Sequence, residues 1–227
     1  MIILILAKLK LIHSQIINLI FPRRCLGCKT PETYLCLDCV DKINRADGSE
    51  TAKGVLALFD YHDRVAKKAI WQLKYHGRKE IGEILGRVAY ARLIEDLAER
   101  RLWSGRTEKI LVIPAPLSRQ RERARGFNQS ALIARAFGAG DPENFAVLEK
   151  VLIKIKNTPA QVSLKNRKAR LKNLRGAFKI SDRKKIKNRD VIIIDDVATT
   201  GATITECQKM LKRAGARSAL PLAIASG

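Results

Sequence analysis

The sequence predicts an α/β fold in which a parallel sheet is flanked by helices and preceded by a small cysteine-rich module. Two runs of consecutive aliphatic residues, 110–113 and 191–194, each lead through a loop toward a helical pattern. Such uninterrupted runs are typical of central parallel strands, which are buried on both faces. The module is indicated by four cysteines that cluster between residues 25 and 39.

The composition is that of a folded, strongly basic protein. A chain of 227 residues has room for one full domain and a small appendage, and 46% apolar residues supply a sizeable core. The formal net charge of +22 predicts polyanionic partners: nucleic acid, an acidic membrane surface or phosphorylated small molecules. Much of the excess lies in residues 150–189, where 15 basic residues accompany one acid.

The first 21 residues are rich in Ile and Leu but match neither a secretory signal nor a membrane span. The apolar run begins at Met1, and Lys8, Lys10 and His13 interrupt it. It is far shorter than the ~20 residues that a spanning helix needs. Helical spacing of the apolar residues favours a helix that packs on the protein, or one that inserts shallowly into a membrane surface. We therefore expect no transmembrane segment, although peripheral membrane contact is possible.

Two CxxC pairs follow, with seven residues between them. Each pair can present two thiolates to one ion, and two pairs fill a tetrahedral site with no position left for water. The sequence thus predicts a structural zinc ion in a reducing, cytoplasmic compartment; reduced cysteines without metal, or a redox pair, are the alternatives. The expected ligands are Cys25, Cys28, Cys36 and Cys39.

A polar stretch at 44–54 divides the chain into a helix and zinc ribbon over 1–45 and a larger domain over 46–227. Apolar periodicity predicts that the larger domain begins with a strand and two helices, at 55–61, 64–75 and 80–101. Later elements of the same domain are expected at 129–137 (helix), 145–155 (strand), 204–214 (helix) and 218–225 (strand).

The strand 110–113 stops at a loop made of Pro114, Ala115, Pro116 and Leu117. If this strand lies parallel to 191–194, both loops leave the same carboxyl edge of the sheet, where open α/β sheets bind ligands. Four arginines between 119 and 125 come next. Such a run is usually a solvated face, but here its forked donors are well placed to meet a pyrophosphate. Asn128 then supplies an N-cap for the helix at 129–137.

The strand 191–194 is followed by two adjacent carboxylates, which we expect to end it. Unpaired first-turn amides and the positive helix end favour an anion in the next loop, whose members are Ala198, Thr199, Thr200, Gly201, Ala202 and Thr203. Carboxylates beside a phosphate loop suit a sugar phosphate, because they accept hydrogen bonds from vicinal ribose hydroxyls. No GxxxxGK[ST] motif is present, which argues against an ATPase. A buried strand with a polar turn, the simpler interpretation, does not explain the two acids.

Residues 191–203 resemble the phosphoribosyl pyrophosphate (PRPP) motif of type I phosphoribosyltransferases. Over nearly its whole length the chain resembles the ComF family, which joins a zinc ribbon to a phosphoribosyltransferase-type domain. The Arg-Gly-Phe-Asn-Gln stretch at 125–129 makes this match specific. The other matching stretches are 21–25 with the cysteine quartet, 73–78, 114–117, 158–161 with Arg167 and Asn173, and 195–203.

The resemblance implies a PRPP site in which Asp195 and Asp196 hold the ribose hydroxyls and residues 198–203 hold the 5′-phosphate. The loop 114–117 would bind pyrophosphate, with Lys74 and Arg125 as candidates for neutralising it. Mg²⁺ would bridge the pyrophosphate and ribose oxygens, and stabilisation of the departing pyrophosphate would be the main catalytic contribution.

The resemblance also implies a role in natural transformation, in the uptake or processing of single-stranded DNA during competence, with further proteins of that machinery as partners. The candidate DNA contacts in the basic segment are Lys165, Arg167, Lys168 and Arg170. We favour a PRPP-binding, phosphoribosyltransferase-like protein of unknown acceptor that also contacts DNA. The alternative is a non-catalytic accessory protein that binds single-stranded DNA by charge and by stacking on Trp71, Tyr75 or Phe127. A PRPP-responsive transcription regulator would need a helix-turn-helix, where the sequence offers a zinc ribbon.

Overall fold

The computed structural model describes residues 22–46, 54–104, 108–157, 174 and 176–227, the side chains of 95–104 excepted. The chain forms two compact units, divided between Ile43 and Asn44. The predicted N-terminal helix lies outside the described residues. So does the stretch 158–161 together with Lys165, Arg167, Lys168, Arg170 and Asn173.

The N-terminal unit is a small module held by local backbone contacts. Arg24 and Pro31 form an isolated antiparallel bridge, and the Cys25 N–H donates to the Thr30 carbonyl at 2.8 Å. Helix α2 (Leu37–Asp41) begins directly after Cys36, which places Cys39 within its first turn. The loop and the helix thus each present two cysteines.

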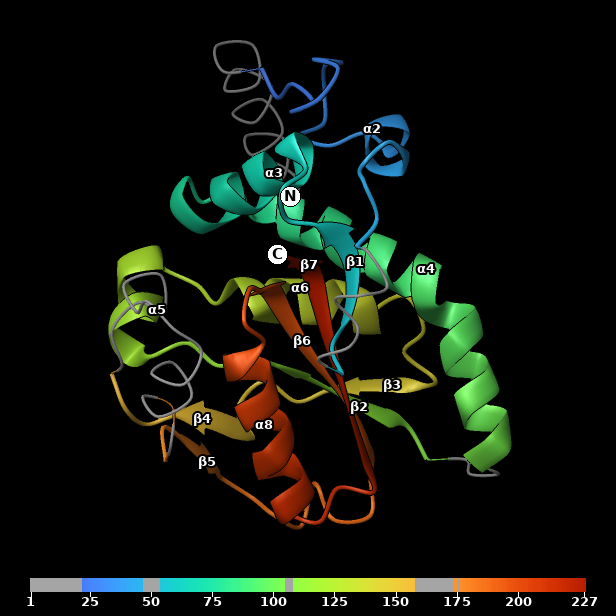
Figure 1. Ribbon diagram of the computed structural model, residues 1–227, viewed down its shortest axis with the longest axis vertical. Helices are drawn as coiled ribbons and strands as arrows, with labels where there is room; N and C mark the ends of the chain where they lie inside the picture. Colours follow the sequence, from blue (N-terminus) through green and yellow to red (C-terminus); the bar gives the residue numbers. More distant parts are fainter. Residues whose placement is uncertain (1–21, 47–53, 105–107, 158–173, 175) are drawn as a thin grey trace, which may run out of the picture. The chain divides into compact units, whose positions relative to one another are not determined.

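A five-stranded parallel sheet forms the centre of the larger unit (Figure 1), in the order β1–β7–β6–β2–β3. The two strands predicted from aliphatic runs are neighbours: Val112 pairs with Ile192, and Ile113 pairs with Ile193. This confirms that their loops leave the same edge. The five strands are β1 (Leu56–Asp60), β2 (Ile110–Pro114), β3 (Phe145–Val147), β6 (Asp190–Ala198) and β7 (Ser218–Ser226).

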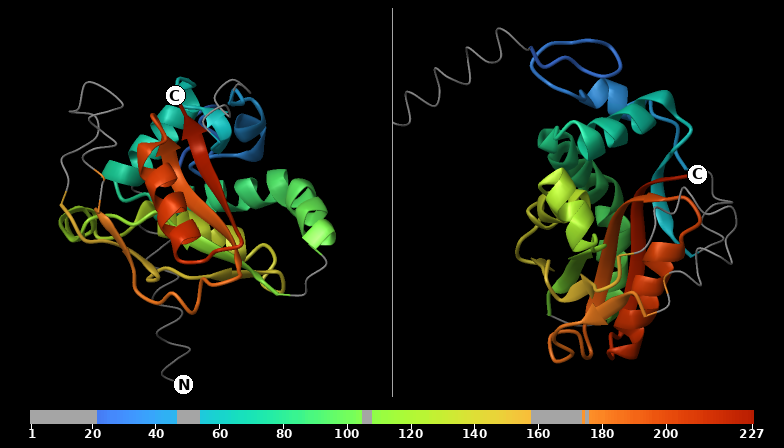
Figure 2. Two further views of the ribbon diagram at one scale, coloured as in Figure 1. Left: turned by 60° about the horizontal axis from the view of Figure 1, so that its bottom comes forward. Right: turned by 90° about the vertical axis from the view of Figure 1, so that its left-hand side faces the viewer.

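Helices cover both faces of this sheet (Figure 2). Helix α8 (Ala202–Arg213) lies on one face, and α6 (Gln129–Gly138) lies on the other together with α4 (Lys79–Ser104). The α4–α6 contact is close enough to require a glycine, because a Cβ at Gly86 would lie 2.4 Å from the Ile133 carbonyl oxygen. Helix α3 (Arg64–Tyr75) has the predicted bounds and is capped by Asp63, whose side chain accepts the N–H groups of two first-turn residues.

Three elements differ from the sequence prediction. Strand β6 does not end before the two acids but runs through them to Ala198, because β7 continues to pair with it there. The single strand expected at 145–155 is split by a charged turn at 149–150 into β3 and β4 (Leu152–Lys154). Strand β4 forms an antiparallel pair with β5 (Phe178–Ile180), and their apolar side chains join the core under α8.

The arginine run forms a short helix, α5 (Arg119–Arg125).

Candidate functional site

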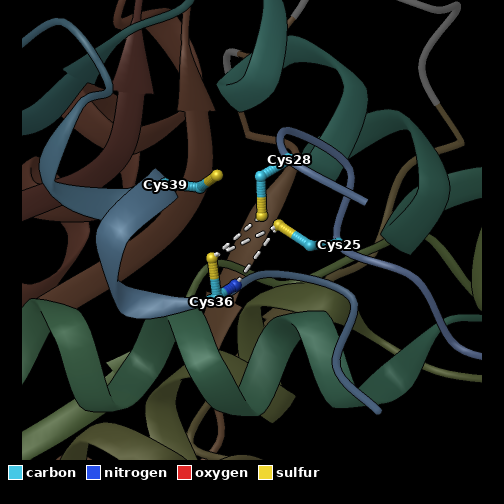
Figure 3. A group of neighbouring side chains, drawn as sticks. All are labelled: Cys25, Cys28, Cys36 and Cys39. Carbon is cyan, nitrogen blue, oxygen red and sulfur yellow. Dashed lines mark hydrogen bonds between the residues drawn. The ribbon is translucent and has the colours of Figure 1, made fainter. Parts of the chain in front are cut away.

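The four cysteines of the N-terminal unit converge on one point (Figure 3). Their sulfur atoms all lie within 4.8 Å of one another, and Cys36 Sγ lies 3.6 Å from Cys25 Sγ and 3.5 Å from Cys28 Sγ. Around a tetrahedral zinc ion with Zn–S bonds of about 2.3 Å, sulfur atoms are roughly 3.8 Å apart. The cluster therefore fits a closed four-thiolate zinc site.

The thiols of this cluster differ in acidity because their surroundings differ. Hydrogen bonds from the side chain and backbone of Thr30 lower the pKa of Cys28 to about 6, whereas burial and the neighbouring thiols raise the pKa of Cys39 to about 12. One thiol thus ionises readily and another resists ionisation unless a cation compensates its charge. A zinc ion in the cluster would supply that compensation for all four, because thiolate is the ligating form.

In the larger unit, Asp195 and Asp196 lie in the last residues of β6 at the carboxyl edge of the sheet. Successive side chains of a strand point to opposite faces, so the two carboxylates have different neighbours. Asp195 Oδ1 accepts a hydrogen bond from Ser130 Oγ at 3.0 Å and another from the Asp196 N–H at 2.9 Å. Burial and the charge of Asp196 nevertheless raise the pKa of Asp195 to about 7.

Asp196 is 4% exposed and pairs with a cation from α3. Lys74 Nζ lies 2.9 Å from Asp196 Oδ1, and both side chains are largely buried. Burial alone would lower the pKa of Lys74, but the charge and hydrogen bond of Asp196, helped by the charge of Asp195, raise it above its ordinary value. Asp196 Oδ2 is buried and has no hydrogen-bond donor among the described residues. Asp196 therefore keeps one buried oxygen whose capacity to accept a hydrogen bond the described residues leave unused.

The loop after β2 lies beside these acids. The Ala115 N–H donates to the Ile194 carbonyl at 2.8 Å, next to Asp195 in the chain, and Asn128 Nδ2 donates to the Ala115 carbonyl at 3.1 Å. Asn128 also accepts the Ser130 N–H as the N-cap of α6, as the sequence predicted. One asparagine thus fixes both the loop 114–117 and the start of the helix that carries Ser130.

The loop between β6 and α8 closes the other side of the site. Gly201 adopts φ 67°, a left-handed conformation that favours glycine, and its carbonyl accepts the Thr205 N–H at 2.9 Å. A hollow of about 10 Å³ is lined by Asp195, by Thr199, Gly201 and Thr203 and by their neighbours. This is the volume of about one water molecule, so a phosphate would lie over the loop and not within it.

A larger pocket of about 250 Å³ lies between the end of α3 and α5. Its lining includes Lys74 together with Arg121 and Arg125 of α5. Arg125 Nη1 donates to Gln129 Oε1 at 2.9 Å. Burial and the charge of Arg125 lower the pKa of Arg121. The pocket is therefore cationic, and Lys74 connects it to the carboxylate pair.

The structure gathers most of the residues predicted from the sequence. The described candidates come from three predicted segments: Lys74 on α3, the loop 114–117 with Arg125, and residues 195–203. They lie at one edge of the sheet or at the pocket beside it. Sequence reasoning missed Ser130, which nothing in its spacing marked, and Lys154, whose signal was a lone charge between Ile153 and Ile155. Lys154 is 8% exposed; burial and then the charge of Arg121 lower its pKa, while the charge of Asp195 acts in the opposite direction.

Comparison with known proteins identifies relatives over most of the chain. The DNA utilization protein YhgH of Shigella flexneri is 30% identical over 192 residues, which cover 85% of this chain and 79% of that protein. The protein of the same name from Escherichia coli K12 is 29% identical over the same length. Competence protein F of Haemophilus influenzae is 34% identical over 106 residues, 46% of this chain and 44% of that protein. No protein-family model matches the chain.

Solved structures similar to this chain include phosphoribosyltransferases at low sequence identity. A hypoxanthine phosphoribosyl transferase of Trypanosoma cruzi is 14% identical, with 62% of this chain and 64% of that chain covered and a TM-score of 0.39. A glutamine PRPP amidotransferase from B. subtilis is 15% identical, with 66% and 29% covered and a TM-score of 0.41. The assignment of the chain to a family rests on the sequence relatives and not on these structures.

A helix must be long and apolar to cross a bilayer. Within the ranges that the structure covers, none of the helices is both long and apolar enough to span a membrane.

Proposed function

Because this chain belongs to the ComF family of competence and DNA-utilization proteins, we propose that it binds PRPP at the carboxyl edge of its sheet. In this proposal it acts as a phosphoribosyltransferase-like protein in the uptake or processing of single-stranded DNA, within the reducing cytoplasm. The observation that carries the proposal is the pair Asp195 and Asp196, held between Ser130 and Lys74 beside two strand-end loops.

The carboxylate pair has the chemistry of a ribose-diol site. Asp195 has a raised pKa and lies against another acid, so hydroxyl donors or a cation would stabilise its charged form. Asp196 Oδ2 is an acceptor to which no described residue donates. Ribose hydroxyls would donate to these carboxylates, whereas a simple phosphate would be repelled by them.

The two loops divide the phosphates of PRPP between them. Residues 198–203, with the start of α8, would hold the 5′-phosphate through amides and hydroxyls, and α8 has no acid in its first turn to oppose an anion. The loop 114–117 would hold the pyrophosphate, and Arg125 with Lys74 would neutralise it as it leaves. Mg²⁺ would enter with PRPP, where carboxylate and phosphate oxygens suit its preference for hard ligands. The residues that fit it are Asp195 and Asp196.

Calorimetric titration of Mg²⁺ and PRPP into the full chain tests this proposal. Wild type should bind, and the variant Asp195→Asn/Asp196→Asn should lose binding. The matched control is Asp182→Asn/Glu143→Gln, which removes the same two charges outside this edge of the sheet and should bind as wild type does. Equal affinities of wild type and Asp195→Asn/Asp196→Asn would reject the site, and so would no binding to wild type. If PRPP binds, release of pyrophosphate in the presence of bases or single-stranded DNA would identify the acceptor.

A second candidate function is favoured by the charge of +22 and by the exposed rings of Trp71 and Tyr75. In that case the protein is a non-catalytic accessory that binds single-stranded DNA, and the fold is a scaffold. Lys165, Arg167, Lys168 and Arg170 would then dominate affinity through phosphate contacts. The absence of PRPP binding, together with salt-dependent DNA binding, would favour this function over the first.

A further inference from the structure

An exposed aromatic surface lies at the carboxyl-terminal end of α3. Trp71 and Tyr75 are one helical turn apart, are 48% and 63% exposed, and have ring centroids 6.2 Å apart. His76 is also exposed and brings a third ring to 4.3 Å from Trp71. The core-facing positions of α3 are occupied by other residues: Ala66, Ala69, Ile70 and Leu73. The rings of this surface therefore face solvent.

Cations flank these rings. The guanidinium of Arg125 lies 5.4 Å from the centroid of Tyr75, and Arg121 of the same helix lines the pocket next to that ring. Helix α5, which carries Arg125, has four arginines and a single acid, Glu122. Rings that stack on bases and cations that meet phosphates are the two components of surfaces that bind single-stranded nucleic acid.

The cationic pocket of about 250 Å³ lies directly beside this surface. Tyr75 and Gly77 form part of its lining, and Arg121 and Arg125 of α5 form another part. Gly77 adopts φ 63°, which allows the chain to leave α3 sharply after Tyr75. Lys74 lines the same pocket and is paired with Asp196. A base stacked on Tyr75 would thus contact the residue that follows Lys74, the partner of Asp196, in the chain.

We infer that the Trp71–Tyr75 surface binds unstacked bases of a single-stranded nucleic acid, whose phosphates follow the arginines of α5 toward the pocket. The binding itself does not require bound PRPP, although Arg125, which flanks Tyr75, is also proposed to meet the pyrophosphate. The further consequence, that the strand is presented to bound PRPP, rests on the proposed function. Duplex DNA does not satisfy this surface, because its bases are paired and stacked on one another.

Tryptophan fluorescence tests the contact directly. The chain has two tryptophans, so the variant Trp103→Phe leaves Trp71 as the single reporter. An oligothymidylate should quench its emission saturably, and an oligouridylate of the same length shows whether DNA or RNA is preferred. In anisotropy titrations, Trp71→Ala/Tyr75→Ala should weaken binding by at least about tenfold, because base–aromatic stacking contributes about fivefold or more per base and two rings are removed. Trp71→Phe/Tyr75→Phe should keep most of the affinity, and Leu37→Ala, which truncates a 69% exposed apolar side chain of α2 in the N-terminal unit, should keep all of it.

Three results would overturn the inference. Binding of the strand without quenching of Trp71 would place it elsewhere, equal quenching by duplex DNA would exclude base stacking, and unchanged affinity of Trp71→Ala/Tyr75→Ala would exclude the surface. The PRPP titration separates this inference from the proposed function. Quenching by the strand without PRPP binding rejects the proposed function alone, whereas PRPP binding without quenching rejects this inference alone.

Discussion

Lys74 Nζ of α3 lies 2.9 Å from Asp196 Oδ1 of β6, and the two residues are 17% and 5% exposed at their side chains. This pair joins a helix that comes early in the chain to the strand that carries both acids. Before any ligand binds, the charge of Lys74, expected from the sequence to serve pyrophosphate, is thus directed at a carboxylate. A ligand cation or ribose at Asp196 would compete with Lys74 for this carboxylate.

The Lys74–Asp196 pair can be tested by a double-mutant cycle. Lys74→Met leaves a buried carboxylate without its cation, so we expect the free energy of unfolding to fall by about 3–5 kcal/mol. Lys74→Met/Asp196→Asn removes the orphaned charge and should recover part of that loss. Denaturant unfolding of the wild type, both single variants and the double variant measures the coupling. Additive losses would show that the pair contributes nothing beyond its separate members.

Asp195 should make stability fall as the pH rises. Its folded pKa of about 7 lies above its ordinary value of 3.8, so the native state binds its proton more tightly than the unfolded chain does. The contribution of the protonated carboxyl to the free energy of unfolding is complete below about pH 4 and is lost as the pH rises to about 7. Asp195→Asn cannot ionise and can still accept from Ser130. We expect its melting temperature to exceed that of wild type by at least ~2–4 °C above pH 7, and to match it near pH 4.

Asp182→Asn, at a partly exposed carboxylate outside the site, is the control for that comparison and should shift melting little at either pH. If Asp195→Asn and wild type differ by the same amount at pH 4 and pH 8, the carboxyl of Asp195 ionises normally.

Zinc should be lost when the cysteine cluster is broken. Cys25→Ser/Cys28→Ser removes two of four converging thiolates, so we expect no retained zinc and loss of the ordered N-terminal unit. Cys207→Ala changes a buried cysteine of α8, outside the cluster, and should retain the metal. Metal analysis of the purified chains decides the matter; a wild type without zinc would refute the site.

The basic segment should control how DNA binding depends on salt. We expect replacement by Glu to lower affinity for single-stranded DNA when it is made at all four positions: Lys165, Arg167, Lys168 and Arg170. The slope of log K against log salt should fall by about 0.7 for each phosphate that is no longer neutralised. Reversal of four exposed charges in the β5–β6 connection is the matched control: Arg183, Lys184, Lys185 and Lys187. Equal slopes in both variants would locate the phosphate-binding residues outside 165–170.

Patterns within short stretches of sequence were sufficient to predict the elements whose formation depends mainly on neighbouring residues. Aliphatic runs predicted two neighbouring strands, helical periodicity gave α3 its bounds, and Asn128 is the N-cap that its residue type suggested. The cysteine spacing predicted a cluster because two CxxC pairs this close can present four thiolates to one ion.

Contacts between distant segments could not be predicted in this way. Ser130 and Asp195 are 65 residues apart, and no pattern near either residue marks their hydrogen bond. The length of β6 was underestimated because acids are poor strand formers, but pairing with β7 extends the strand through them. The β4–β5 pair likewise depends on a partner that follows β4 by more than 20 residues.

The extension of β6 has a consequence for how tightly a ligand can be held. Asp195 and Asp196 are mounted on a strand whose backbone pairs with β7 as far as Ala198 and Ser226, so their positions are fixed before anything arrives. A carboxylate on a mobile loop would lose conformational entropy on binding, and that loss would be subtracted from affinity. Here the ordering has already taken place during folding. In hydrogen exchange, the amides of this strand should be among the slowest in the protein, and the half of the site that holds the sugar should behave as a rigid template.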